Sequence, residues 1–585
     1  GDVNIHPRWP ARLDLRLEFA WTGRVVSREG VSRRGFLKSS SIAVAAVGAA
    51  TGVAGALPRV ARAQGAEFVP FAHGVASGDP TPDAVIVWTR VTPTPDARPG
   101  SGVGPVTSVR WRVATDPELT NLVRSGTVST SADVDHTVKV DVDGLSAATT
   151  YHYCFEVLDG PAAGTQSTIG TTRTAPTNDA DVDRIRFGVV SCSNWESGYF
   201  GAYRHLASRT DLDAIIHLGD YLYEYRTGAF AGKYGVVRQH DPVHEIVSLS
   251  DYRIRHGQYK SDPDLQAAHL GVPWICTWDD HESANDAYDG GAENHQPETE
   301  GPWNVRKANS VQAYYEWMPV RVAGTPQNRH LYRRLRFGSL LELSMLDLRT
   351  YRSKQVAPTA GAAVDSPDRT ITGRDQMNWL TDGIVSSPTT WKIVGNPVMI
   401  TPVLVPPLES EAAGALTELL GIPRGGVPYM ADPWDGYTAD RARLLGAIAD
   451  NGVNNTVFIT GDIHSSWACD IPQDAARYFE TGAVATELVV TSVSSANVDD
   501  LTRTPPHTLG RVAESALTTL NRHIRYVELD SHGFGVFTVT PTGVQMDHWY
   551  LDAKEDPLTG VYWGAGFTVP AGTARVEHAA LPVRT

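Results

Sequence analysis

The chain has 585 residues, a length typical of two to four domains. Hydrophobic residues make up 42% and charged residues 20%, a composition typical of a folded protein and not of a disordered one. Its formal net charge of −15 disfavours a non-specific nucleic-acid binder, which needs a positive surface, so no stable nucleic-acid partner is expected. Four cysteines in a chain of this length exclude a disulfide-stabilised scaffold.

The first 66 residues have the pattern of an export signal. Arg33 and Arg34 begin the run RRGFLK, an Ala-, Gly- and Val-rich stretch follows over 42–57, and residues 61–63 supply a small-x-small cleavage site. The apolar stretch is too short for a membrane span, which needs about 20 strongly apolar residues. We therefore expect 1–66 to be a twin-arginine signal peptide with an extended n-region. Its partner would be the twin-arginine export machinery, and the protein would be secreted or lie in the periplasm or cell wall.

Residues 67–175 are expected to form a small all-β sandwich. Short strand patterns separated by turn residues recur there at intervals typical of such domains, at 84–91, 109–113 and 136–142. Leu145 followed by Tyr151 resembles the tyrosine corner of fibronectin-type sandwiches. The polar stretch 174–183 indicates a linker.

From residue 184 the strands end in chemically reactive side chains. Apolar runs of this kind lie at 185–190, 214–218, 273–278, 391–394 and 456–460. Helical segments lie between them, at 200–209, 305–317, 373–385 and 438–450. Sites in such α/β sheets form outside the carboxyl ends of the strands. We assign the catalytic domain to 184–550, closed by a hairpin over 536–550, and expect 551–585 to be a C-terminal tail.

Four residues after these strands, Cys192, Asp220, Asn396 and His464, are candidates for a functional site. Each has an ordinary structural alternative. An Asp after Gly often caps a helix, Cys can be a small buried hydrophobe, Asn often occupies a turn, and His464 could be a hydrogen-bonded histidine of the core. A carboxylate, a thiol, an amide and an imidazole at successive strand ends are together typical of a site for two or more metals.

The exact sequences of these motifs are more specific than their positions at strand ends. Residues 219–223 have the form GDxxY, residues 280–282 (DHE) stand where metallophosphoesterases have Asn-His-Glu, and 461–464 (GDIH) stand where they have Gly-His-x-His. Together with the runs 73–80, 190–193, 278–282, 435–437 and 461–466, these motifs resemble the PhoD-type alkaline phosphatases and phosphodiesterases of the calcineurin-like and purple acid phosphatase superfamily. The resemblance spans about 67–550. It implies a four-layer metallophosphoesterase α/β sandwich preceded by a small fibronectin- or Ig-like β domain.

The resemblance also implies Fe(III) and one or two Ca(II) ions. By this likeness the iron ligands are Cys192, Asp220, Tyr223 and His464, with Asp220 bridging to the second metal. Asp280 and Asp462 replace an amide and an imidazole by carboxylate oxygen, which agrees with calcium, a hard cation. Asn396 is a candidate further oxygen ligand.

Three residues are candidates for the chemistry itself. In the wider superfamily the histidine at the position of His281 contacts the phosphoryl or leaving group. By this likeness His281 is assigned as general acid or transition-state stabiliser. Arg352 is the candidate phosphate clamp, as is its neighbour Arg349, with a structural ion pair as the alternative for either. Asn194 either binds a metal or phosphate oxygen or caps a turn.

The expected activity is that of a secreted, metal-dependent phosphoesterase. There is no GxSxG motif and no P-loop, so the expected nucleophile is a metal-bound hydroxide. The expected substrates are small phosphate mono- or diesters. Phospholipids and teichoic-acid-like polymers stay open, because some members of the family act as phospholipase D. The non-enzymatic alternatives are a surface-binding protein built on the β-sandwich and a calcium-stabilised structural protein.

Overall fold

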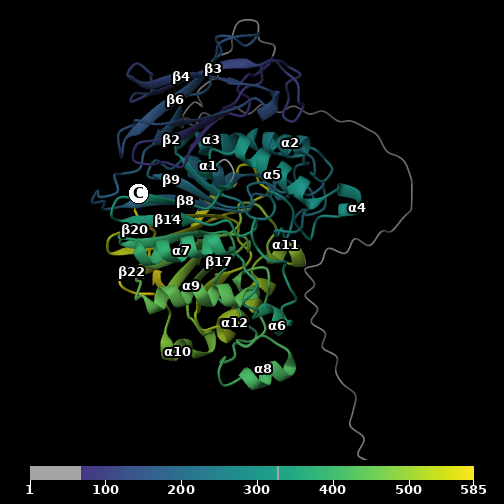
Figure 1. Ribbon diagram of the computed structural model, residues 1–585, viewed down its shortest axis with the longest axis vertical. Helices are drawn as coiled ribbons and strands as arrows, with labels where there is room; N and C mark the ends of the chain where they lie inside the picture. The colour runs from purple at the N-terminus through teal and green to yellow at the C-terminus, as the bar shows by residue number, and fades with distance from the viewer. Residues whose placement is uncertain (1–67, 326–327, 585) are drawn as a thin grey trace, which may run out of the picture. The chain divides into compact units, whose positions relative to one another are not determined.

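The computed structural model describes residues 68–325 and 328–584, so the expected signal peptide lies outside the described residues. Two large β-sheets form the centre, and helices cover their outer faces (Figure 1). Among the described residues, no helix is both long enough and apolar enough to cross a bilayer.

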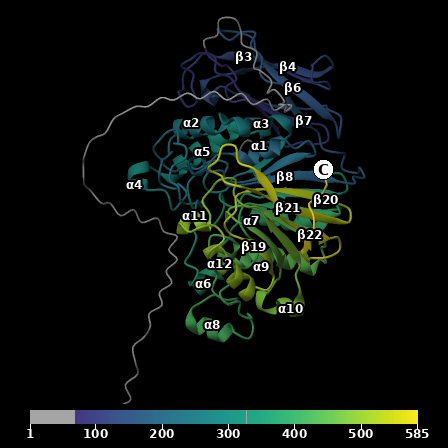
Figure 2. The ribbon, with the colours of Figure 1, turned by 180° about the vertical axis from the view of Figure 1, so that it is seen from behind.

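The first sheet has ten strands in the order β23–β22–β21–β20–β8–β9–β10–β1–β2–β5. Their bounds are Val75–Gly78 (β1), Val85–Arg90 (β2), Thr137–Val142 (β5), Ile185–Val190 (β8), Ala214–Leu218 (β9), Trp274–Thr277 (β10), Gly533–Thr540 (β20), Gly543–Leu551 (β21), Val561–Pro570 (β22) and Glu577–Ala579 (β23). Strands β8, β9 and β10 are parallel. Strands β20 to β22 extend the sheet in antiparallel fashion and lie side by side in Figure 2.

The expectation of a tail over 551–585 is wrong, because β22 and β23 are strands of this sheet. Ala565, Phe567 and Val569 alternate along β22 and are buried in the central core, which explains why the segment is ordered. The expected hairpin over 536–550 corresponds to β20 and β21.

The second sheet has seven strands in the order β13–β14–β15–β16–β18–β17–β19. Their bounds are Arg333–Phe337 (β13), Leu341–Met345 (β14), Trp391–Asn396 (β15), Thr456–Thr460 (β16), Ser466–Ile471 (β17), Ala485–Val489 (β18) and Ile524–Glu528 (β19). Strands β14, β15, β16 and β18 are parallel. One apolar core, which includes Phe187, Ile216, Leu343, Ile393 and Val457, joins this sheet to the first, so the two sheets pack face to face.

Helices form the two outer layers. A second core packs α1 (Gly201–Ala207), α2 (Leu249–Lys260), α3 (Pro263–Gly271) and α5 (Trp303–Trp317) on the first sheet through residues such as Tyr203, Leu265 and Trp274. A third core packs α7 (Arg374–Ser386) and α9 (Thr438–Asp450) on the second sheet through Leu380 and Phe458. The catalytic part is therefore helix, sheet, sheet and helix, the four layers that the family resemblance implied.

The remaining helices and the two-stranded hairpin lie in the connections. They are the helices α4 (Pro297–Glu300), α6 (Gly361–Val364), α8 (Gly414–Leu420), α10 (Tyr478–Thr481), α11 (Val498–Thr502) and α12 (Leu509–Leu520), and the hairpin of β11 (Ala323–Thr325) and β12 (Asn328–His330).

The N-terminal β domain has two sheets around its own core. The strands β3 (Thr107–Ala114), β4 (Leu122–Thr130), β6 (Thr150–Val157) and β7 (Gly170–Arg173) form one sheet, which faces β1, β2 and β5. The tyrosine corner is present, since the N–H of Ser146 donates to the Tyr151 hydroxyl at 2.8 Å. Strands β1, β2 and β5 are part of the ten-stranded sheet of the catalytic domain, because β1 pairs with β10 at Gly78 and Trp274. A Cβ at Gly78 would lie 2.0 Å from the carbonyl oxygen of Pro319, so this junction requires glycine.

Candidate metal centre

The candidate site lies where strands of both sheets end. Cys192 follows β8 and Asp220 follows β9, while Asp462 and His464 follow β16 of the other sheet. All four have left-handed backbones, with φ values of 60°, 55°, 66° and 53° respectively. Such conformations are costly for residues other than glycine and concentrate at functional sites, where the surrounding structure holds them.

Two features bring the turns after β9 and β10 together. Gly219 has a φ of 107°, and a Cβ there would lie 2.6 Å from the backbone nitrogen of Asp279, so only glycine allows this approach. The buried carboxylate of Glu282 accepts from the N–H groups of Asp220, Tyr221 and Asp279 at 3.1, 2.6 and 2.9 Å. Glu282 thereby fixes the loop that carries Asp220, a role that the sequence did not reveal.

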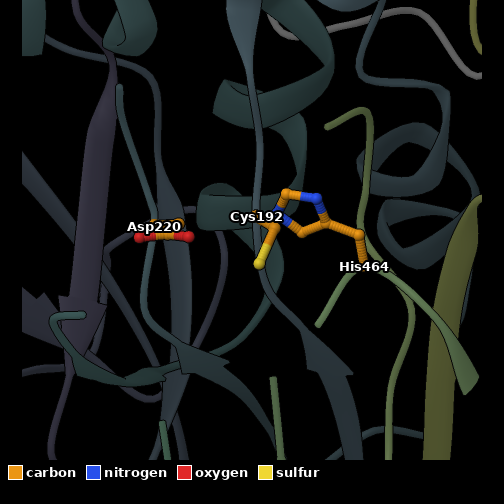
Figure 3. Close-up of side chains that lie close together, drawn as sticks. All are labelled: Cys192, Asp220 and His464. Atoms are coloured by element: carbon orange, nitrogen blue, oxygen red, sulfur yellow. The ribbon is translucent and has the colours of Figure 1, made fainter. Parts of the chain in front are cut away.

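The first group of possible ligands combines Cys192, Asp220 and His464 (Figure 3). Each offers one atom, and these atoms all lie within 4.8 Å of one another. The Tyr223 hydroxyl joins them, since it donates to Asp220 Oδ2 at 3.2 Å and lies 3.2 Å from His464 Nε2. His464 Nδ1 donates to the carbonyl of Ala496 at 2.7 Å, which turns Nε2 toward the group. The structure thus brings together all four residues expected to hold iron.

Asp220 also belongs to two further groups. One contains Asp280 and His281, and the other contains Asp279 and Asp462. The Oδ1 atom of Asp280 is buried and accepts no hydrogen bond from the part of the chain that the structure describes, so it could bind a cation. The sequence analysis did not assign Asp279 as a ligand, although the residue stands inside the WDDHE run.

The electrostatics of the first group fit a bound metal. Burial raises the pKa of the Cys192 thiol, the Tyr223 phenol and the Asp220 carboxyl, because the charged forms lose their hydration. Burial lowers the pKa of His464 to about 4, so its imidazole is neutral, the form that binds metals. A cation at this position would restore the thiolate, the phenolate and the carboxylate, so this donor set fits a metal.

His281 is held by a carboxylate that the sequence analysis missed. Its Nδ1 lies 2.7 Å from Glu224 Oε2, and Glu224 Oε1 accepts from the Asn285 N–H and the Asn294 side chain, both at 2.8 Å. Burial would lower the pKa of His281, but the charges of Asp280 and Glu224 outweigh it and raise that pKa well above its ordinary value. The neighbouring carboxylates therefore favour the protonated form of His281 beside the three groups. The sequence signal that could have identified Glu224 is its position directly after the GDxxY motif.

Arg349 takes the structural alternative that the sequence left open. Its guanidinium pairs with Asp279 at 2.5 Å and with Asp432 at 2.8 Å. It also lies 3.7 Å from Asp280 and 3.7 Å from Asp462. Arg349 therefore offsets part of the negative charge of the acidic cluster.

Arg352 is buried near Arg349 but is not fully paired. Its Nη2 donates to the Asp432 carbonyl and the Tyr437 hydroxyl, both at 2.8 Å, and forms an ion pair with Asp432 Oδ1 at 3.1 Å, the structural alternative that the sequence left open. Nη1 is buried and has no hydrogen-bond partner among the described residues. Nη1 is thus available to an anion, and the phosphate-clamp role of Arg352 stays a prediction.

The structure does not bring Asn194 and Asn396 to the centre as ligands. Asn194 Oδ1 caps a short turn by accepting from the Glu196 N–H at 3.1 Å, and its Nδ2 donates to the Phe230 carbonyl at 2.9 Å. Asn396 Oδ1 accepts from the Trp434 indole at 3.1 Å, and its Nδ2 donates to Thr460. We correct both assignments, because hydrogen bonds within the protein occupy both ends of each amide.

Comparison with known proteins decides the family. Residues 187–548 match the model of the PhoD-like phosphatase family, and residues 56–176 match that of its N-terminal domain. The chain belongs to the PhoD-like phosphatase family. It is 34% identical over 505 residues to alkaline phosphatase D of Bacillus subtilis (strain 168), a match that covers 85% of this chain and 80% of that protein. The predicted family is thus confirmed.

Solved structures agree with this membership. A structure of PhoD matches with a TM-score of 0.76 and 31% identity, covering 88% of this chain and 93% of its own. The purple acid phosphatase PPD1 from yellow lupin seeds matches with a TM-score of 0.50 and 12% identity over 85% of this chain and 73% of its own, a likeness of fold alone. The PhoD-like chain is a phosphoric ester hydrolase. The two non-enzymatic alternatives are set aside.

Proposed function

We propose that this PhoD-like protein hydrolyses small phosphate mono- or diesters with Fe(III) and one or two Ca(II) ions at the centre described above. The iron ligands would be Cys192, Asp220, Tyr223 and His464, and the calcium ligands would be the carboxylates of Asp220, Asp279, Asp280 and Asp462. The observation that carries the proposal is the convergence of a thiol, a phenol, an imidazole and a carboxylate on one buried point.

The donor types support this choice of metals. Thiolate and phenolate are strong anionic donors that favour a trivalent ion, whereas a group made only of carboxylates, such as Asp220, Asp279 and Asp462, suits calcium. When bound, such ions supply Lewis acidity and offset the charge of the phosphate group.

The chain's own residues supply the proton and part of the anion site. Nδ1–H of His281 donates to Glu224, which leaves Nε2–H beside the centre, 3.9 Å from Asp280 Oδ1. From that position Nε2 would give its proton to the leaving oxygen of the ester. The unpartnered Nη1 of Arg352 would donate to a phosphoryl oxygen.

A metal assay combined with a substrate panel tests the proposal. Purified protein should contain iron and calcium and should hydrolyse p-nitrophenyl phosphate, bis-p-nitrophenyl phosphate or both. A calcium chelator should abolish turnover while iron stays bound. Undiminished activity in excess chelator would contradict the calcium assignment. Phosphatidylcholine vesicles and a polyol-phosphate polymer belong in the same panel, and a preference for either would replace the small-ester proposal.

We also propose export by the twin-arginine route. The support is the run that begins at Arg33 and Arg34, which lies outside the described residues. Replacing both arginines by lysine should keep the protein in the cytoplasm. Normal secretion of that variant would refute this route.

A further inference from the structure

One apolar ring lies beside residues of the candidate metal centre. Phe230 stands in the loop between β9 and α2, and its ring centroid lies 6.1 Å from that of Tyr223, 6.4 Å from that of His281 and 6.3 Å from that of His464. Its plane is within 19° of Tyr223 and 26° of His281. Tyr223 is fully buried and the two histidines are 6% and 7% exposed, whereas Phe230 is half-buried. Tyr225, whose ring centroid lies 5.5 Å from that of Phe230, is also partly exposed, so these two rings form the outer side of the group, and Phe230 is the one without a polar side-chain atom.

The turn that follows Cys192 holds the backbone of Phe230. The Phe230 N–H donates to Glu196 Oε1 at 2.8 Å, and the Phe230 carbonyl accepts from Asn194 Nδ2 at 2.9 Å and from Ser197 Oγ at 3.1 Å. These three residues are themselves buried. The segment that places one expected iron ligand thus also places Phe230.

The same loop is anchored again a few residues further on. The Lys233 N–H donates to Asp500 Oδ1 at 3.1 Å, and the Lys233 ammonium pairs with Asp499. Bonds at Phe230 and at Lys233 hold the backbone of this loop beside the centre, which limits the positions open to the Phe230 ring. A ring held in this way is pre-organised for contact with a ligand and does not need to be ordered on binding.

We propose that Phe230 contacts the organic group of the ester and favours substrates with a planar aromatic group beside the phosphate. This inference rests on the proposed phosphoesterase function. The phosphate oxygens would face the acidic centre with its metals and Arg352, whereas Phe230 offers an apolar surface without a hydrogen-bonding side-chain atom. Its partly exposed ring can pack against a second planar ring, an arrangement that favours aromatic over alkyl groups by about three- to tenfold in affinity.

Two phosphonates that differ only in their organic group test the proposal. Calorimetric titration of the metal-loaded protein with phenylphosphonate and methylphosphonate gives a ratio of dissociation constants without turnover. The phenyl compound should bind the unmodified protein more tightly. Phe230→Ala should remove about three- to tenfold of this preference and leave the affinity for methylphosphonate unchanged, while Phe230→Tyr should keep the preference.

Tyr234→Ala is the matched control. Tyr234 is an aromatic residue of the same loop, is 71% exposed, and its described ring contact is with Lys233, so its removal should leave the ratio unchanged. Metal content is measured in every variant, and hydrolysis of p-nitrophenyl phosphate on the same samples tests the proposed function separately. No phenyl preference in the unmodified protein, or an equal change for both phosphonates in Phe230→Ala, would overturn the inference.

The residues that hold Phe230 give an independent test of positioning. Ser197→Ala removes one bond to the Phe230 carbonyl, and Asn194→Ser removes the other while it keeps a residue able to cap the turn. Each variant should reduce the phenyl preference two- to fourfold with iron content and methylphosphonate affinity unchanged. An unchanged ratio in both variants would contradict the positioning role.

Discussion

The hydroxyl oxygen of Tyr223 lies 3.2 Å from Nε2 of His464, although 241 residues separate the two in the chain. Tyr223 follows β9 of the ten-stranded sheet and His464 follows β16 of the seven-stranded sheet. The contact therefore exists only because the two sheets pack face to face with their strand ends at the same place. The candidate metal centre of this PhoD-like phosphatase is a product of that packing.

Asn396→Ala should destabilise the protein without changing its metal content. The substitution leaves the buried Trp434 indole without its acceptor and removes a donor to Thr460, so we expect a loss of about 1–3 kcal/mol in the free energy of unfolding. Urea unfolding and elemental analysis of the same preparation give the two readings. Loss of one metal equivalent at unchanged stability would restore Asn396 as a ligand.

Arg349→Met should strongly destabilise the metal-free protein at pH 7. The buried carboxylate of Asp279 would lose its cation, which costs about 3–5 kcal/mol, whereas Asp432 would keep its ion pair with Arg352 at 3.1 Å. Thermal unfolding in chelator measures the effect. Arg443→Met is the control, because the Arg443 side chain is 50% exposed and its pair with Asp440 should contribute less than about 1 kcal/mol. Equal small effects in both variants would show that Arg349 does not stabilise the cluster.

Lys260 should make the stability of the protein rise with pH. Burial lowers the pKa of Lys260 to about 7, and among the described residues its Nζ contacts His269 Nε2 at 3.0 Å and the rings of Trp88 and Tyr221, none of which is a carboxylate. In the unfolded chain the pKa is about 10.4, so the unfolded state binds more protons between pH 7 and pH 10. The penalty for burying the charge is therefore complete below pH 7 and decreases as pH rises.

The variant Lys260→Met isolates this effect. It should be more stable than the parent by a few kcal/mol at pH 7, and the difference should shrink toward pH 10, as measured by urea midpoints at both values. A difference that stays constant with pH would show that Lys260 is not titrating in this range.

The sequence predicted the elements whose apolar pattern is plain. The helices expected at 305–317 and 438–450 correspond to α5 and α9. Helix α2 was not predicted, because its buried face contains Arg253, Arg255 and Lys260 and so lacks an apolar periodicity. A helix whose buried face is charged can be predicted only when the tertiary partners of those side chains are known.

The same limit applies to the site. The sequence identified Cys192, Asp220 and His464 because each belongs to a motif that follows a buried strand. It could not show where a side chain points, so Asn396 was assigned to the centre although its amide turns toward Trp434. Glu224 was missed because its role depends on His281, which lies 57 residues further along the chain.

The most direct test of the account is the visible spectrum and iron content of Tyr223→Phe. This change keeps the ring and removes only the hydroxyl that meets Asp220 and His464. We expect a coloured parent protein with a phenolate-to-iron absorption band. Tyr223→Phe should be folded, should lose or shift that band, and should have greatly reduced turnover.

Tyr221→Phe and Tyr225→Phe serve as controls, since the Tyr221 hydroxyl contacts His269 and the Tyr225 ring packs beside His281. Both should keep the band. Full colour and full turnover in Tyr223→Phe would contradict the proposed metal centre.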